Sequence, residues 1–487
     1  MNPFLLLSIE LTLTFFAVII LLVVILRPRA EESETSDPSV SLTHQDDTIP
    51  SVITSIAFLV PLIFIPMLWN QAGYLFNNAF RSDSFSLFFK GLFLISGFFI
   101  TLISRDYQNR IGKRSSEFFL LLITAVLGAS FLVSANDFLT FFISLELLTI
   151  SAYVLSAYQR TSARALEAAG KYLIMGAFSS AVLLFGIAFI YGNFGSVSFE
   201  LIQQTIRSEF DIAFSAYFGF FLVLAGLGFK ISAFPFQLWA PDVYEGSPTP
   251  LTAFLAIISK GAGFAVLIKL AFGVFALVRL EFTLLFSLLA SATLLYGNLG
   301  AIPQIGGNIK RLLAFSGISH AGYLLIGVAS GSSLGVAAIL YYLTAYAVAT
   351  LILFFVIAQL APNESVPSFK GLFGRNFLLG SVLFIALLSL AGVPPLGGFF
   401  AKYMIIQSAV GQNLLSLAIL GALNIMISLY YYLMVIKTMY VDSANSNAET
   451  ISLSLTSKVS VAALTLVLIG LGLFQAPFLD LIAQALS

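Results

Sequence analysis

The segment Gly226–Pro250, GLGFKISAFPFQLWAPDVYEGSPTP, places a lysine and a proline inside a stretch that is otherwise apolar. A lysine such as Lys230 is costly in apolar surroundings, and a proline such as Pro235 removes a helix hydrogen bond. The pattern returns in LAGVPPLGGFFAKY, residues 390–403, where two prolines and two glycines precede Lys402. A helix break at membrane depth is tolerated only where its freed backbone groups meet water or protein polar groups. Each break therefore predicts a hydrated pocket beside its lysine.

The composition is that of an integral membrane protein. Of 487 residues, 59% are hydrophobic and 9% are charged, whereas about a quarter of the residues in a soluble domain are charged. The net charge is zero, which argues against a nucleic-acid partner. The absence of cysteine excludes disulfides, cysteine nucleophiles and thiolate-ligated iron–sulfur clusters. The two histidines, His44 and His320, argue against a His-ligated haem or metal site.

Fourteen apolar runs are each long enough, at about 20 residues, to cross a bilayer as a helix. They begin near Phe4, Val52, Leu87, Phe118, Phe138, Ala165, Ala213, Pro250, Phe282, Ile309, Leu334, Phe377, Leu414 and Val459. The first run lacks a basic flank and a small-residue cleavage site, so we expect it to be a retained span and not a signal peptide. The sequence predicts one all-α membrane domain over residues 1–487, with no module outside the membrane.

The two interrupted spans, the seventh and the twelfth, lie five spans apart and therefore cross the membrane in opposite senses. This spacing predicts two inverted five-helix repeats, each containing a broken helix. We expect three N-terminal helices with a polar loop at 27–51 (residues 1–115), a first repeat (116–280) and a second repeat (281–440). A C-terminal loop and a last helix would follow (441–487).

Basic residues are strongly biased to one side of the predicted spans. Connections after odd-numbered spans carry fourteen of them: Arg27, Arg29, Arg105, Arg110, Lys113, Arg114, Arg160, Arg164, Lys310, Arg311, Lys370, Arg375, Lys437 and Lys458. The other side has Arg81, Arg207 and Arg279, with Lys90 and Lys269 near span ends. Cytoplasmic loops carry such an excess. We therefore expect loops 27–51 and 105–114 on the cytoplasmic or matrix side, and both termini on the positive side of an energised membrane.

Five ionisable residues lie deep inside predicted spans: Glu146, Lys171, Lys230, Lys260 and Lys402. Such residues are rare and usually face a polar path inside the bundle. A carboxylate favours the charged form of a nearby lysine. Moving Glu146 toward or away from Lys230 would therefore load and unload a proton.

Lys171 and His320 each allow two interpretations, and one further acid, Glu10, lies near a span end. Lys171 lies seven residues past Arg164, so a snorkelling side chain is the alternative to a buried one. His320, in KRLLAFSGISHAGYLL, is either a satisfied interhelical donor or a member of a proton relay. Glu10, near the end of the first span, is interpreted as a helix-packing acid.

Four segments resemble the antiporter-like membrane subunits of respiratory complex I. They are GFKISAFPFQLWAPDVYEGSPTPLTAFLAIISK, EAAGKYLIMGAFSSAVLLFGIAFIYG, IKRLLAFSGISHAGYLLIGV and AGVPPLGGFFAKY, and the phrase YEGSPTP is specific. The resemblance covers roughly Leu120–Tyr440 and is closest to the N-type branch, which includes mitochondrial and photosynthetic B-type counterparts. The acidic loop Arg27–Ser51 is longer than the resemblance leads us to expect.

The resemblance implies a role for each matching residue. Glu146 matches the family's fifth-span glutamate, and Lys230 matches its seventh-span lysine partner. Lys171, Lys260 and Lys402 match the lysines of the sixth, eighth and twelfth spans. The M-type subunits have a glutamate in the twelfth span, so Lys402 favours the N or L type. The chain lacks the long C-terminal lateral helix of the L type, which leaves N.

The resemblance also implies a proton-translocating subunit of NADH:quinone oxidoreductase that holds no cofactor itself. NADH (or reduced ferredoxin in photosynthetic relatives), FMN, iron–sulfur clusters and quinone would be bound by partner subunits. No GxGxxG motif precedes a helix in this chain, which agrees. The expected partners are membrane subunits of the A, H, J, K, L and M types and the lipid bilayer. The expected location is the bacterial inner membrane, with the mitochondrial inner membrane as the alternative.

Two rival functions fit the sequence less well. A subunit of a multisubunit cation/proton antiporter would have a similar site, but Na⁺ needs clustered oxygen ligands and Glu146 is the only central acid. A purely structural subunit would use polar groups to hold helices together, and serine or threonine would do this at lower cost than four lysines. Co-purification with flavin- and cluster-carrying partners would separate these functions.

Overall fold

The computed structural model describes residues 3–26, 48–107, 115–208, 213–275, 279–361, 363–440 and 451–487. Within these residues, twelve helices are long and apolar enough to span a membrane, and two shorter apolar helices, Phe214–Lys230 and Phe377–Ala391, accompany them. Each of the fourteen expected spans begins within about four residues of one of these helices. The all-α membrane fold is thus confirmed, while most of loops 27–51 and 105–114, with His44, lies outside the described residues.

The first half of the chain contains the following elements. They are α1 (Pro3–Leu6), α2 (Ser8–Leu26), α3 (Thr48–Leu59), α4 (Phe64–Leu68), β1 (Gly73–Leu75), β2 (Phe80–Ser82), α5 (Ser84–Asp106), α7 (Ser115–Ser134), α8 (Phe138–Ser156), α9 (Ala163–Phe194), α10 (Phe199–Ser208), α11 (Phe214–Lys230), α12 (Trp239–Gly246), α13 (Thr249–Phe254) and α14 (Lys260–Lys269). Two π-helical segments, Leu255–Ser259 and Leu270–Val274, flank α14, and a 3-10 turn, Val60–Ile63, joins α3 to α4.

The second half continues with helices only. They are α15 (Arg279–Ala301), α16 (Ile309–Ser330), α17 (Ser333–Leu360), α18 (Leu372–Arg375), α19 (Phe377–Ala391), α20 (Gly397–Val410), α21 (Leu415–Tyr440), α22 (Leu455–Leu473) and α23 (Gln475–Leu486), with 3-10 turns at Ile302–Gln304 and Val366–Phe369. The division of the chain into two inverted repeats stays a prediction.

The two predicted breaks are present, and side chains satisfy the backbone groups that they free. In the first break, between α11 and α12, the backbone N–H of Phe234 donates to Thr293 Oγ1 at 3.0 Å, and Trp239 Nε1 donates to the Phe229 carbonyl at 2.9 Å. In the second, between α19 and α20, the N–H of Gly398 donates to Ser389 Oγ at 3.1 Å. Polar side chains thus allow irregular backbone at this depth.

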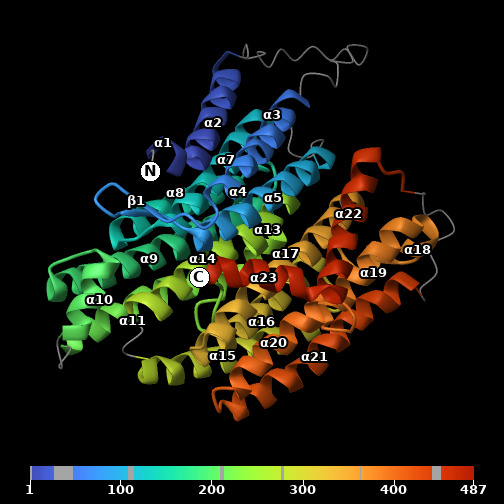
Figure 1. Ribbon diagram of the computed structural model, residues 1–487. Coiled ribbons are helices and arrows are strands. Elements are labelled where there is room, and N and C mark those ends of the chain that lie inside the picture. The colour runs from blue at the N-terminus through green and yellow to red at the C-terminus, as the bar shows by residue number, and fades with distance from the viewer. Residues whose placement is uncertain are drawn as a thin grey trace.

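Small residues let neighbouring helices pack backbone against backbone. A Cβ atom at Gly297 of α15 would lie 2.4 Å from the Ser319 nitrogen of α16, and one at Gly186 of α9 would lie 2.7 Å from the Gly219 carbonyl oxygen of α11. Membrane helices commonly associate through such contacts. The close packing joins α15 to α16 and α9 to α11, and Figure 1 shows where these helices lie in the bundle.

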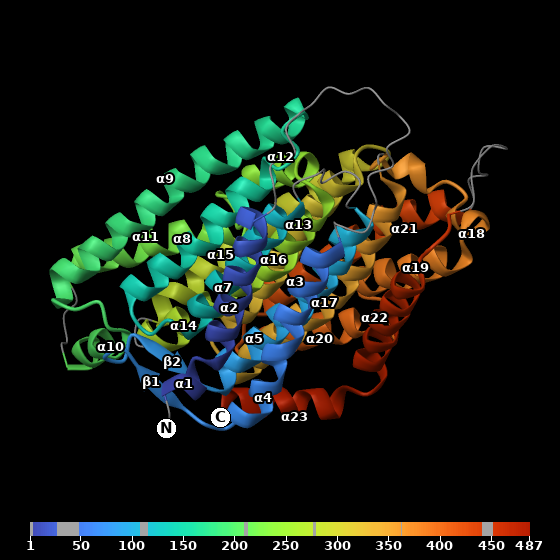
Figure 2. The ribbon, with the colours of Figure 1, turned by 90° about the horizontal axis from the view of Figure 1, so that it is seen from above.

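The short elements gather at one face of the bundle. Figure 2 shows α1, β1, α4, α10 and α23 there, beside both marked chain ends, whereas α12 lies near the opposite face. The strands pair antiparallel, with Gly73 opposite Ser82. Both ends on one face is the arrangement expected for an even number of spans.

Candidate functional site

Lys230 is the last residue of α11, directly before the first break, and only 4% of it is exposed. Its ammonium donates to Thr149 Oγ1 of α8 at 2.9 Å. Glu146 lies one turn before Thr149 on the same face of α8, and its Oε1 accepts from Ser180 Oγ of α9 at 2.5 Å. No direct ion pair between Glu146 and Lys230 occurs in the described chain. The structure places Glu146 one helical turn from Thr149, the residue that accepts the hydrogen bond of Lys230.

Lys260 begins α14, immediately after the π-helical segment Leu255–Ser259. Its Nζ donates to the carbonyl of Gly317 on α16 at 2.6 Å and lies 5.7 Å from the centre of the Tyr346 ring. The absence of a side chain at Gly317 leaves room for this approach, because a Cβ there would lie 3.0 Å from the Lys260 nitrogen and 3.4 Å from the Tyr346 hydroxyl. A π-helical insertion is often found at functional sites, and here it precedes the central lysine.

The helix of Lys260 packs directly on Lys230. A Cβ at Gly263 of α14 would lie 3.6 Å from Lys230 Cγ and 2.8 Å from Ile231 Cγ2. The absence of a side chain at Gly263 thus lets α14 approach the aliphatic stem of Lys230. The two lysines occupy neighbouring positions inside the bundle.

Lys402 lies on α20, just past the second break, and is 2% exposed. Its Nζ donates to the carbonyl of Ala391, the last residue of α19, at 3.0 Å and to Ser428 Oγ of α21 at 3.4 Å. The Tyr323 ring centre is 5.0 Å away. The break therefore supplies the lysine with a backbone acceptor that an unbroken helix would have used itself.

His320 of α16 stands between the central and the terminal lysine. One ring nitrogen is hydrogen-bonded to the Tyr342 hydroxyl at 2.6 Å and the other to the Tyr432 hydroxyl at 3.1 Å. His320, Tyr342, Tyr346 and Lys402 also line a cavity that offers about 10 Å³ to the centre of a water-sized molecule, which is about the room one water needs. Both ring nitrogens are thus satisfied, and His320 also faces the pocket expected beside Lys402, so the structure is compatible with either interpretation of this residue.

Lys230, Lys260, His320 and Lys402 are all buried and are called the buried line below. The surroundings of its three lysines are unusual for a protein interior. Burial penalises an ammonium unless it is paired and hydrogen-bonded, yet the direct acceptors of Lys230, Lys260 and Lys402 are hydroxyls and backbone carbonyls. Neutral acceptors can serve a neutral amine as well as a charged one. The arrangement can therefore hold a proton at each lysine and also release it.

Lys171 lies in a different environment, a surface network of ion pairs. Its side chain is 43% exposed, and its Nζ contacts Asp242 at 2.7 Å and Glu167 at 2.8 Å. Arg311 Nη1 also contacts Asp242, at 2.6 Å. The structure does not bring Lys171 to the buried line, because it lies on the outward face of α9.

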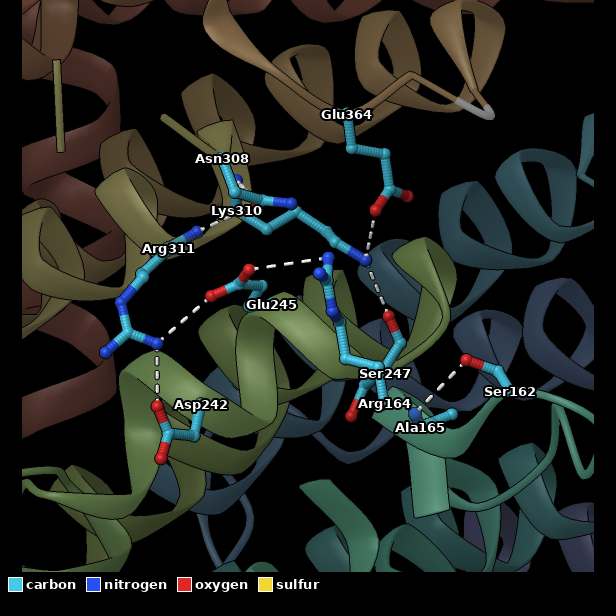
Figure 3. A network of polar contacts seen from close by, with 10 residues as sticks. All are labelled: Ser162, Arg164, Ala165, Asp242, Glu245, Ser247, Asn308, Lys310, Arg311 and Glu364. Carbon is cyan, nitrogen blue, oxygen red and sulfur yellow. Dashed lines mark hydrogen bonds and ion pairs between the residues drawn. The ribbon is translucent and has the colours of Figure 1, made fainter. Parts of the chain in front are cut away.

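The same network extends toward the interior (Figure 3). Arg311 reaches Glu245 at 3.0 Å, while Lys310 contacts Glu364 at 2.6 Å and donates to the Ser247 carbonyl at 2.7 Å. Burial raises the pKa of Asp242 in α12, but the hydrogen bonds from Lys171 and Arg311 outweigh it and hold this pKa below its usual value. The half-helix after the first break is thus tied to α9 and α16 by ionised groups.

The tyrosines of the buried line were missed in the sequence analysis. Tyr342 and Tyr346 stand four residues apart in YYLTAY, which puts both on one face of a helix. Tyr432 in LYYYLMV gave no periodic signal, because three tyrosines in a row leave its orientation open. In the described residues, no group of three or more histidine or acidic side chains lies close enough to hold a metal ion.

Comparisons with known proteins agree with this geometry. Residues 135–428 match the family model described as NADH:quinone oxidoreductase/Mrp antiporter, TM. The chain is 35% identical to the NADH-quinone oxidoreductase subunit N of Paramagnetospirillum magneticum, over 88% of this chain and 89% of that protein. It superposes with a TM-score of 0.82 on a chain of respiratory complex I from Thermus thermophilus, at 28% identity and with 98% and 99% of the two chains covered. A chain of the Mrp complex from Dietzia shares the fold at a TM-score of 0.80 and 20% identity, over 100% and 97% of the chains.

Proposed function

Because this chain belongs to the family of NADH:quinone oxidoreductase and Mrp antiporter membrane subunits, we propose that it is a proton-translocating membrane-arm subunit of NADH:quinone oxidoreductase. It works in a bacterial inner membrane among other membrane subunits of the complex, of the A, H, J, K, L and M types. NADH, FMN, iron–sulfur clusters and quinone are bound by partner subunits.

The proton path runs through Glu146, Lys230, Lys260, His320 and Lys402. The observation that carries this proposal is the cavity shared by Lys402, His320 and Tyr346, because Tyr346 also flanks the ammonium of Lys260. A proton leaving Lys260 has hydroxyl and imidazole acceptors in sequence up to the terminal lysine. Lys230 lies against the helix of Lys260 through Gly263, and Glu146 adjusts the charge of Lys230.

The chain needs an external energy source for net transport. Moving one charge against 100 mV costs about 2.3 kcal/mol, and the relay itself contains no redox group. Electron transfer in the partner subunits supplies this energy. The subunit contributes a set of ionisable sites that are held apart from bulk water by the helices.

A cation/proton antiporter subunit is the alternative, and two observations weigh against it. Na⁺ prefers several oxygen ligands, whereas Lys260 and Lys402 contact one carbonyl each and Glu146 has no second carboxylate beside it in the described contacts. The similarity to the Mrp chain, at 20% identity, supports the shared fold alone. The contacts of Lys260, Lys402 and Glu146 suit proton transfer better than the binding of Na⁺.

The test uses the intact complex with Lys402→Met, which keeps the length of the side chain and removes its basicity. We expect normal assembly on a native gel, together with a several-fold loss of NADH-driven proton uptake after reconstitution into vesicles. Lys402→Arg should fail in the same way, since an arginine does not release its proton. Lys458→Met, on an exposed part of α22, is the matched control. Full proton uptake in assembled Lys402→Met would overturn the relay.

A further inference from the structure

A second group of buried charges lies outside this path, behind a cavity at the face that carries α10 and α23. The cavity has a volume of about 450 Å³. Its polar lining comes from β2 and the β2–α5 connection, the α7–α8 connection, α10, the end of α14 and the start of α17: Arg81, Asp83, Asn136, Glu200, Gln203, Lys269 and Ser333. Residues of α10 and α23 line it, and Figure 2 shows these two helices at the face that carries both chain ends. Its volume is enough for several waters.

Lys269 stands at the inner end of this cavity. It is the last residue of α14, and its Nζ donates to the carbonyls of Val133 and Ala135, the latter at 3.2 Å. These carbonyls lie at the end of α7, where a helix leaves acceptors unused. Lys260, at the other end of α14, contacts α16 instead. The two lysines of this helix therefore serve different regions.

A buried ion pair joins two of the helices that pack against α7. Glu10 of α2 and Lys90 of α5 meet at 2.7 Å, with side chains 2% and 0% exposed, and Ser130 donates to Glu10 Oε1 at 2.6 Å. Sequence analysis interpreted Glu10 as a packing acid, and the structure gives it a charged partner. Buried ion pairs contribute little net stability. The presence of one among α2, α5 and α7 therefore suggests a role other than stabilising the fold.

Phe80 connects the pair with Lys269. Lys90 Nζ lies 4.9 Å from the centre of the Phe80 ring, and the backbone of Phe80 pairs with that of Ala135. Ala135 in turn accepts from Lys269. Phe80 and Ala135 thus link the ion pair with Lys269 through contacts of ring and backbone.

Acceptors without partners gather in the same region. Glu10 Oε2 and the hydroxyls of Ser8, Ser82 and Ser134 are buried and have no hydrogen-bond partner in the described chain. They come from α2, β2 and the end of α7, the elements that surround the ion pair. Buried polar atoms normally find a partner in protein or water. These oxygens are suited to accept hydrogen bonds from water that enters through the cavity.

We propose that Lys269 and the Glu10–Lys90 pair form a second proton-exchange site, open through the 450 Å³ cavity to the face that carries α10 and α23. The proposal rests on the proton-translocating function above and adds an outlet to it. An N–H bond of the Lys269 ammonium breaks, the electron pair stays on Nζ, and a cavity water gains the proton. The amine regains a proton when an N–H bond of the Lys90 ammonium breaks, and Lys90 is protonated again by water held at the unpartnered oxygens around the pair. Arg81, Asp83 and Glu200 are the other charged groups that face this exchange.

The first test blocks the cavity in the assembled complex. Gln203 lines it and donates to the Gly273 carbonyl at 2.7 Å, whereas the adjacent Gln204 is exposed and points away. Because the chain has no cysteine, Gln203→Cys can be modified with a cationic methanethiosulfonate and compared with Gln204→Cys and the unsubstituted complex. We expect turnover to fall about tenfold after modification of Gln203→Cys alone, equivalent to about 1.4 kcal/mol in the barrier. Unchanged turnover of the fully modified protein would overturn the proposal.

The second test asks whether Lys269 exchanges a proton or is a fixed charge. Lys269→Arg keeps the charge but does not release a proton, so it should lose proton uptake as strongly as Lys269→Gln. Full proton uptake by Lys269→Arg would show that Lys269 is a fixed charge and would overturn the proposal. If both Lys269 variants take up protons normally while Lys402→Met does not, the second site is refuted and the central relay still stands. Normal uptake by all of them would refute both proposals. If Lys269→Gln does not assemble, the cysteine modification decides.

Discussion

The position of the Lys402 ammonium depends on a residue without a side chain. Gly392 has φ +87°, a conformation that L-residues with a Cβ avoid, and it follows Ala391, whose carbonyl accepts from Lys402. A Cβ at Gly392 would lie 2.9 Å from Lys402 Cδ. Backbone conformation and lysine position are therefore set by the same residue.

Gly392→Ala should accordingly damage both stability and transport. We expect about 2 kcal/mol of destabilisation from the left-handed backbone and the contact with Lys402. The detergent-solubilised complex should dissociate at a lower temperature and take up protons more slowly. Gly470→Ala is the matched control, since no atom lies within 4 Å of its Cβ position in the last turn of α22. Equal dissociation temperatures for the two variants would show that the turn adapts to a side chain.

Sequence reasoning found these lysines because a charge inside an apolar run is visible without coordinates. It did not find Thr149, Gly317 or Tyr346, which contact the lysines from other helices. Threonine, glycine and tyrosine are common in membrane helices, so their identity carries no signal until the helix faces are known. Lys171 was ambiguous for a related reason, because depth within a span does not say which way a side chain points.

At the scale of elements, the broken helices are the features that the sequence predicted best. Proline beside glycine and lysine is a local pattern, and it marked both breaks. The π-helical segment Leu255–Ser259 before Lys260 was not predicted, since one additional residue in a turn changes no periodicity that the sequence displays. The ion pairs that fix α12 to α9 and α16 also depend on tertiary packing.

Asp242 supplies a prediction about pH and salt. Its pKa is held below the usual value, so its contribution to stability is present above the unfolded pKa of about 3.9 and is lost only as pH falls through the lower folded pKa. Asp242→Asn should therefore lower the dissociation temperature of the complex equally at about pH 6 and about pH 8. Because Asp242 and both partners are about a third or more exposed, the loss should stay within about 1 kcal/mol and shrink in high salt.

Glu167→Gln is the comparison for Asp242→Asn. Glu167 also contacts Lys171, but 65% of its side chain is exposed, so its removal should change little. A loss for Asp242→Asn that appears at pH 8 and vanishes at pH 6 would mean that this carboxyl titrates in the neutral range, contrary to the ionised network.

At the scale of the whole molecule, the helices bring together residues that no local pattern connects. The buried line draws on α8, α11, α14, α16, α17, α20 and α21, and the second site draws on α2, α5, α7 and α14. Spacing along the chain could suggest that two halves correspond, but a contact between them, such as that of Lys260 in α14 with Gly317 in α16, follows only from packing. The fold class was therefore predictable, and the assembly of the two sites was not.

The orientation of the molecule follows from the distribution of its basic residues and can be tested with single cysteines. Thr161 is exposed between Arg160 and Arg164, and Gln204 is exposed on α10 at the face that holds both chain ends. The excess of lysine and arginine around Thr161 predicts that it faces the cytoplasm. An impermeant thiol reagent added to intact cells should modify Gln204→Cys, while Thr161→Cys reacts only after the membrane is opened. This outcome would put the cavity of Lys269 on the positive side, where protons are released. The reverse labelling pattern would show that the predicted orientation is wrong. The cavity of Lys269 would then face the cytoplasm and would be a site of proton uptake.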